Sequence, residues 1–69
     1  MEMKITYDSE ADAVYFYFKE IGAGEVKNTI SLNGNLNIDL DKNGVTLGIE
    51  ILDATKNLPQ EVIKSAVIV

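Results

Sequence analysis

The stretch "MKITYDSEADAVYFYF", residues 3–18, contains two strand patterns separated by a short polar segment. Before that segment, Met3, Ile5 and Tyr7 alternate with polar residues, which is the period of a half-buried strand. After it, residues 13–18 are apolar at odd and even positions alike and are rich in aromatic and β-branched side chains. Such a run is typical of a central strand with both faces covered. The stretch therefore predicts two strands joined by the five-residue loop "DSEAD".

Three further segments alternate between apolar and polar residues: 25–32, 35–41 and 45–52. Asn-Gly occurs between them at 33–34 and again at 43–44. Asn-Gly accepts the positive φ angles of a type I′ turn, so both pairs predict tight hairpins. The sequence thus predicts an antiparallel meander of about five strands.

The end of the chain changes period. Pro59 suits the first turn of a helix, and apolar residues at helical spacing follow it in 62–67. A helix this short does not persist alone in water and must dock on the sheet. The expected fold is a single two-layer α+β domain over residues 1–69, with one C-terminal helix on one face. Residues 67–69 either end that helix or add an edge strand.

Composition excludes several classes of activity. The 69-residue chain has no cysteine and no histidine, which excludes thiol catalysis, Cys-ligated zinc and a His-activated serine. No catalytic residue, metal or cofactor is therefore predicted. The net charge of −5 works against nucleic-acid binding and favours a basic protein partner.

Size and hydropathy set further expectations. A domain this small buries little surface and usually needs reinforcement, so a homodimer or a partner complex is expected. The longest apolar run, residues 13–18, is too short to span a membrane. The N-terminus lacks the layout of a secretion signal, so the sequence predicts a soluble, cytoplasmic protein with no membrane association.

Asp8, Glu10 and Asp12 occupy alternate positions and suggest three roles: a calcium loop, a catalytic carboxylate pair or a polar turn. The glycine and the terminal glutamate of a calcium loop are missing, and nothing predicts a cleft that would perturb the carboxylates. The favoured interpretation is a turn in which Asp8 caps residues 9–12 and Asp12 closes it. Metal or ligand binding through these residues, Asp39 or Glu50 remains the alternative.

The outer face of the predicted sheet is the second candidate site. If Val14, Phe16 and Phe18 point to the core, Tyr15 and Tyr17 point outward. The predicted interface consists of Tyr15, Tyr17, Thr46, Gly48 and Glu50, with Asp39 nearby if the strands are neighbours. Aromatic residues on a polar face are typical of interface centres. Local packing of each tyrosine with its hydroxyl in water is the other interpretation.

These segments also resemble a known family. "MKITYDSEADAVYFYF" followed by "NLNIDLDKNGVTLGIEILDAT" is similar to the YuzE-like family of small bacterial and archaeal proteins, domain of unknown function 2283. Thr55 stands where that family more usually has serine. The resemblance implies a small α+β domain and no catalytic residues. For some members it implies an antitoxin role, so the expected function is a non-catalytic protein-interaction module, with a self-associating structural protein as a further alternative.

Overall fold

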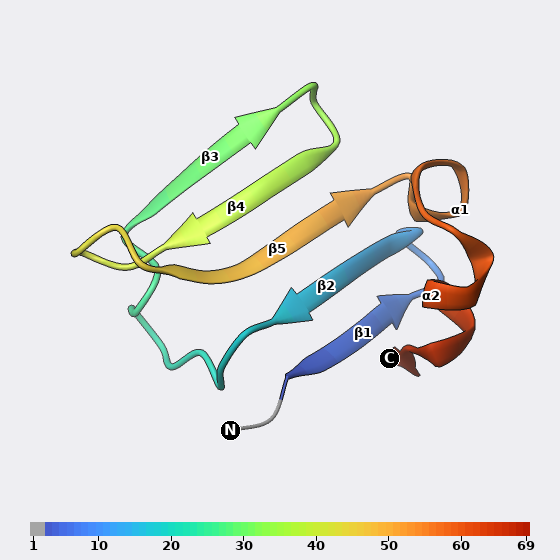
Figure 1. The fold of residues 1–69 in the computed structure, drawn as a ribbon, viewed down its shortest axis with the longest axis horizontal. Coiled ribbons are helices and arrows are strands. Elements are labelled where there is room, and N and C mark those ends of the chain that lie inside the picture. The colour runs from blue at the N-terminus through green and yellow to red at the C-terminus, as the bar shows by residue number, and fades with distance from the viewer. Residues whose placement is uncertain (1–2) are drawn as a thin grey trace.

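The fold is that of a computed structural model, which describes residues 3–69; Met1 and Glu2 of the predicted domain lie outside these residues. Within this range, six strands form one sheet, and two short helices precede the last strand (Figure 1). The strands are β1 (Lys4–Asp8), β2 (Ala13–Tyr17), β3 (Asn28–Leu32), β4 (Leu36–Leu40), β5 (Thr46–Leu52) and β6 (Val67–Ile68). The helices are α1 (Ala54–Asn57) and α2 (Gln60–Ser65). The predicted α+β class is confirmed, and the sheet is antiparallel except where β6 pairs with β1.

The strand order differs from the predicted meander. The sheet runs β3-β4-β5-β2-β1-β6, so β5 separates β4 from β2. Residues 18–27 carry the chain from β2 past the start of β5, where Phe18 N donates to Leu47 O at 3.0 Å. We attribute this order to the apolar faces of β2. They bury more apolar surface beside β5, which carries Leu47, Ile49 and Ile51, than they would beside the more polar β3.

Apolar residues form continuous rows across one side of the sheet, the inner face. One row is Ile30–Ile38–Ile49–Phe16–Ile5, and the next is Leu32–Leu36–Ile51–Val14–Tyr7. Among residues 3–69, the buried apolar side chains are those of Val14, Leu47 and Ala54. Burying a side chain such as Leu47 stabilises the fold by about 1.5–3 kcal/mol. The core therefore lies where β2 and β5 meet α1.

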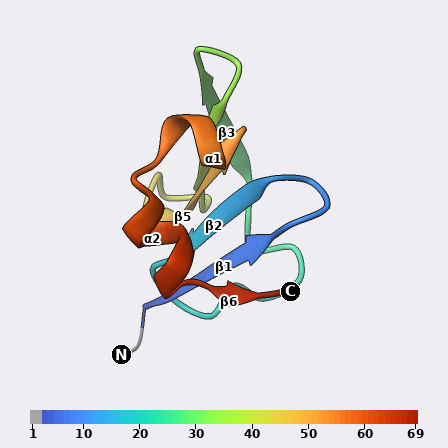
Figure 2. The ribbon, with the colours of Figure 1, turned by 90° about the vertical axis from the view of Figure 1, so that its right-hand side faces the viewer.

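The helical layer is more broken than the sequence predicted. Instead of one helix, α1 follows Asp53, which has φ 50°, and α2 follows Pro59. Residues 67–68 then form β6, which pairs parallel with β1 (Figure 2). The open question about residues 67–69 is thus resolved in favour of an edge strand. No helix within residues 3–69 combines the length and the apolar character that crossing a bilayer requires.

The two Asn-Gly turns are built differently. Asn33 and Gly34 both have positive φ, 54° and 73°, which confirms the predicted type I′ geometry. At 43–44 only Gly44 has positive φ, so the type I′ prediction is wrong there. The cause is Asp41, whose Oδ1 accepts hydrogen bonds from Asn43 N at 2.8 Å and Val45 N at 2.9 Å. This side-chain cap stabilises a loop that is longer than the predicted two-residue turn.

The acidic segment between β1 and β2 is a capped turn, as predicted. Asp8 Oδ1 accepts hydrogen bonds from Glu10 N at 3.0 Å and Ala11 N at 3.2 Å. Asp12 closes the turn in the left-handed region, with φ 52°. Two of the three carboxylates that suggested a site therefore have structural roles.

Asp12 also joins this turn to the junction between β5 and α1. Its carboxylate accepts hydrogen bonds from Tyr7 Oη at 2.9 Å, Thr55 Oγ1 at 2.8 Å and Thr55 N at 3.2 Å. Its backbone oxygen accepts another from Ala54 N at 2.9 Å. The hydrogen bond from the Thr55 hydroxyl is the largest cause that lowers the pKa of Asp12. Asp12 thus connects segments 43 residues apart.

Replacing Thr55 by valine removes one donor to Asp12 while keeping the side-chain shape. We expect the Tm to fall by about 4–8 °C, the shift produced by losing one net hydrogen bond in a small domain. Thr55→Ser retains the hydroxyl and is expected to stay much closer to wild type. Thermal unfolding followed by circular dichroism measures both variants, and equal Tm values for the two would contradict this role.

Acid should weaken the same connection. Because folding lowers the pKa of Asp12, its stabilising contribution is present above the ordinary value of 3.8 and is lost as pH falls through the folded-state pKa. We therefore expect wild type to lose its stability advantage over Asp12→Asn as the pH drops below about 4. Urea unfolding of both proteins at several pH values tests this, and a constant difference would refute it.

Candidate functional site

The side of the sheet opposite the helices, the outer face, brings four of the five predicted interface residues together: Tyr15, Tyr17, Gly48 and Glu50. Tyr15 pairs with Glu50, and Gly48 lies between Tyr17 on β2 and Asp39 on β4. Asp39 was expected near these residues if its strand is a neighbour, and β4 does pair with β5. Thr46 lies apart at the exposed start of β5, beyond a register shift at Asp39/Leu40.

Tyr15 lies across the backbone of β5 at Gly48. A Cβ atom added to Gly48 would lie 2.7 Å from Tyr15 Cζ, closer than side chains approach one another. Gly48 is therefore required for space and not for an unusual φ angle. A glycine inside a strand often marks such a close approach, so the sequence held a signal for this contact.

The Tyr15 hydroxyl reaches Asp39 beyond Gly48. Its Oη donates to Asp39 Oδ2 at 2.5 Å, and Thr29 Oγ1 on β3 donates to Asp39 Oδ1 at 2.6 Å. Both carboxylate oxygens of Asp39 are thus engaged. The contact holds the Tyr15 ring in one orientation over β5.

A second set of hydrogen bonds crosses the same strands. Ser31 Oγ donates to Asn37 Oδ1 at 2.6 Å, and Asn37 Nδ2 donates to Glu50 Oε1 at 3.0 Å. Sequence analysis did not single out Thr29, Ser31 or Asn37. They are polar positions of the alternating segments 25–32 and 35–41, and such positions are usually solvated.

Tyr17 extends the aromatic part of the face toward β1. The Tyr15 and Tyr17 ring centroids lie 4.5 Å apart at an interplanar angle of 49°. Lys4 Nζ lies 4.6 Å from the Tyr17 ring centroid, a cation–π contact that sequence analysis missed. The outer face thus combines two packed tyrosines with the carboxylates of Asp39 and Glu50.

The environment of Tyr15 determines what it can do chemically. Burial is the main cause that raises the pKa of its phenol, followed by the hydrogen bond to Asp39 and by that residue's charge. The phenol therefore stays protonated at neutral pH. It serves as a hydrogen-bond donor and an apolar surface, and a phenolate nucleophile or base is disfavoured.

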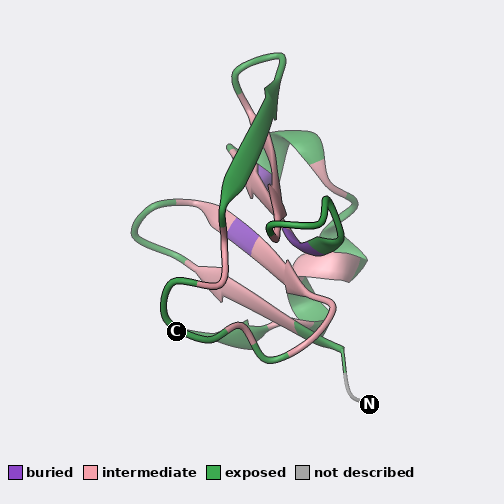
Figure 3. Ribbon diagram, turned by 90° about the vertical axis from the view of Figure 1, so that its left-hand side faces the viewer, coloured by how far each residue is buried: buried purple, intermediate pink, exposed green. Residues whose placement is uncertain are grey.

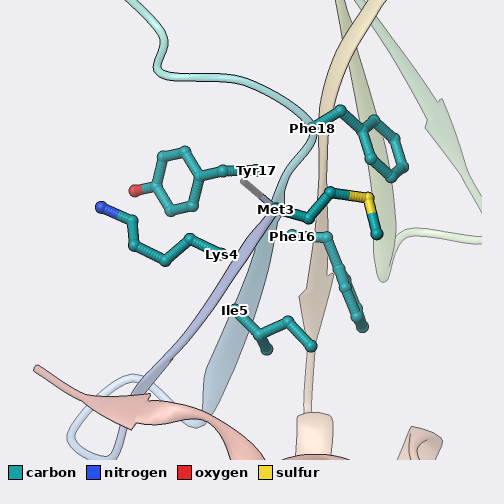
Figure 4. Close-up of a pocket in the computed structure, with 6 residues that line it drawn as sticks. All are labelled: Met3, Lys4, Ile5, Phe16, Tyr17 and Phe18. Atoms are coloured by element: carbon teal, nitrogen blue, oxygen red, sulfur yellow. The ribbon is translucent and has the colours of Figure 1, made fainter. Parts of the chain in front are cut away.

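A pocket on the inner face has no comparable polar groups. It has a volume of about 240 Å³ and is lined by Met3, Lys4, Ile5, Phe16, Tyr17 and Phe18 (Figure 4). The Lys4 amine and the Tyr17 hydroxyl lie on the opposite side of the hairpin from the Met3, Phe16 and Phe18 side chains. The pocket is smaller than most ligand sites and lacks their converging polar groups.

Residues 3–69 contain no group of side chains arranged as metal ligands, which the alternative of a metal site requires. Within this range, no three Asp, Glu, His or Cys side chains are grouped so that they could hold a metal ion. Asp8 and Asp12 accept the hydrogen bonds of the turn and of the α1 junction. Asp39 and Glu50 accept those of the outer face.

Adding a methyl group at Gly48 should displace the Tyr15 ring. We expect Gly48→Ala to cost about 1–3 kcal/mol, as overpacked sites do. Gly22→Ala is the matched control, because its added Cβ would lie an ordinary 3.7 Å from Glu25 Oε1. In a Tyr15→Ser background Gly48→Ala should cost much less, and additive costs in a urea-unfolding cycle would contradict the contact.

Comparison with known proteins assigns the chain to a family. The family model described as "Protein of unknown function (DUF2283)" matches residues 4–54. An uncharacterized protein of Methanocaldococcus jannaschii, MJ0789, is 46% identical over 56 residues, which cover 81% of this chain and 45% of that protein. The chain thus matches less than half the length of this relative, and no solved structure matches it. The matched region includes Asp12 and Ala54, whose backbone hydrogen bond joins the β1–β2 turn to α1. The chain therefore belongs to the DUF2283 family of proteins of unknown function.

Proposed function

We propose that this protein is a non-catalytic interaction module that binds a small basic protein through its outer face. One observation carries the proposal: Tyr15, Tyr17 and Glu50 lie side by side on one sheet face. The hydrogen bond to Asp39 holds Tyr15 in place there. Tyrosines are enriched among the residues that dominate binding energy.

Rigidity supports the proposal. Binding costs less free energy when the contact side chains are ordered before the partner arrives. Tyr15 lies over Gly48 and is anchored at Asp39, while Asn37 holds Glu50. These contacts join β2, β4 and β5, so the face can meet a partner with little rearrangement.

Charge supports a basic partner. Each chain carries a net charge of −5, and opposite charge on a partner speeds association and fixes orientation. Asp39 and Glu50 supply negative charge on the outer face itself, beside apolar ring surface. A basic side chain of the partner can pair with a carboxylate while its aliphatic stem lies against a tyrosine ring.

The absence of histidine and cysteine from the chain supports a binding role over a catalytic one. In its narrowest form the proposal makes the protein an antitoxin-like binder that neutralises a small basic protein in the cytoplasm. That form rests on the family resemblance together with the acidic charge.

The experiment is affinity capture of the partner with tagged chain in a lysate of the organism that encodes it. Two variants each remove one negative charge: Glu50→Gln on the outer face, and Glu10→Gln in the exposed β1–β2 turn. Glu50→Gln can still accept the hydrogen bond from Asn37. Tyr17→Ser removes the half-buried Tyr17 ring without removing either partner of the bond between Tyr15 and Asp39.

We expect wild type and Glu10→Gln to capture the same small basic protein, identified by mass spectrometry. Glu50→Gln and Tyr17→Ser should weaken its binding, and a hot-spot position among them should do so about thirtyfold in Kd. Capture should also decline with added salt. Equal capture by Glu50→Gln and Glu10→Gln, or recovery of the chain alone, would overturn the proposal.

A further inference from the structure

The β3 end of the sheet is left uncovered by the helices. Figures 1 and 2 show α1 and α2 beside β5, β2 and β1, while β3 lies at the far edge. Every residue of β3 is exposed, as Figure 3 shows, and Ile30 and Leu32 remain 47% and 44% exposed. Both belong to the apolar rows of the inner face, which are buried best at β2 and β5.

The total surface is large for a chain of this size. A compact monomer of 7.6 kDa has about 4,300 Å² of accessible surface. This chain has 4782 Å², an excess of about 500 Å² over that expectation. Covering such an area on each of two copies would bury about 1,000 Å² in total, which is at the lower limit for a specific interface.

The β3 strand lacks the features that usually protect an edge. Its sequence, Asn28–Leu32, contains no charged residue and no proline, whereas natural edges commonly carry lysine, proline or a bulge. The register shift in this part of the sheet lies between β4 and β5 and leaves β3 regular. The opposite edge, β6, has only two residues. Backbone hydrogen-bonding capacity for another strand is therefore concentrated at β3.

We propose that β3 is the contact between two copies of this chain, paired antiparallel about a two-fold axis at Ile30. This register places Ile30 opposite its counterpart and Asn28 opposite Leu32, on one face of a continuous twelve-stranded sheet. The four Ile30 and Leu32 side chains then form one apolar patch.

The distribution of charge favours this edge over the outer face as the place where two copies meet. Two chains of −5 repel one another, and β3 offers five consecutive uncharged residues at which two copies meet without facing like charges. The outer face, by contrast, would bring Asp39 and Glu50 of both copies together. The small area predicts a dimer that dissociates on dilution.

Sedimentation velocity of the purified chain, from about 1 μM to 1 mM, tests self-association over the range expected for a small interface. We expect wild type to shift from monomer to dimer across it. Ile30→Lys adds the charge that protects natural edges and should remove the dimer. Val45→Lys is the matched control, because Val45 is 56% exposed and lies outside β3. Circular dichroism checks that both variants fold.

A single cysteine tests the register, because the chain has none of its own. Opposed Cβ atoms across a two-fold axis at Ile30 come close enough for a disulfide. Ile30→Cys should therefore oxidise to a covalent dimer much faster than Val45→Cys. A wild-type chain that stays monomeric throughout, an Ile30→Lys variant as dimeric as Val45→Lys, or equal oxidation rates would each overturn the proposal.

Discussion

The hydrogen bond from Tyr15 to Asp39 constrains the order of the strands in this sheet. For the hydroxyl to reach β4, the Tyr15 ring must cross β5, and it can do so only where β5 has a glycine, Gly48. The contact thus couples three neighbouring strands through one side chain. It requires β5 between β2 and β4, the feature that separates this sheet from a simple meander.

The same contact explains how a domain with so few fully buried side chains obtains an ordered surface. Val14 and Leu47 pack on the inner face of the strands that Tyr15 bridges on the outer face. At the far end of these strands, Asp12 binds the β1–β2 turn to α1 through Thr55 and Ala54. Burial is therefore concentrated around β2 and β5. It declines toward β3, whose residues are all exposed and where we propose that a second copy adds.

Local patterns predicted the elements better than their order. The alternation of Met3, Ile5 and Tyr7, the Asn33–Gly34 turn and the Asp8 cap depend on neighbouring residues, and all three were recognised from sequence. The position of β5 depends on which strand covers β2, a choice between distant segments that periodicity does not encode. The turn at 43–44 was missed because the Asp41 side chain competes for the backbone donors.

The candidate site shows the same division. Alternation placed Tyr15, Tyr17, Gly48 and Glu50 on one face, as observed. It could not reveal that Tyr15 bonds to Asp39, that Asn37 holds Glu50 or that Lys4 stacks on Tyr17, because these contacts depend on strand register. Asp12 was recognised as a turn residue, but its bond to Thr55 links positions 43 residues apart.

Tyr15 is fixed across Gly48 by Asp39, and this makes the outer face a rigid surface. The most direct measurement is the pH titration of the tyrosine Cζ resonances by ¹³C NMR, in wild type and in Asp39→Asn. We predict that Tyr15 titrates with a pKa above the ordinary value of 10, so its contribution to stability persists below that pH and is lost as pH rises through the folded-state pKa. In Asp39→Asn the Tyr15 pKa should fall toward 10 but stay above it, because burial is the larger cause. A Tyr15 resonance that titrates at 10 in both proteins would show that Asp39 and burial do not fix this ring.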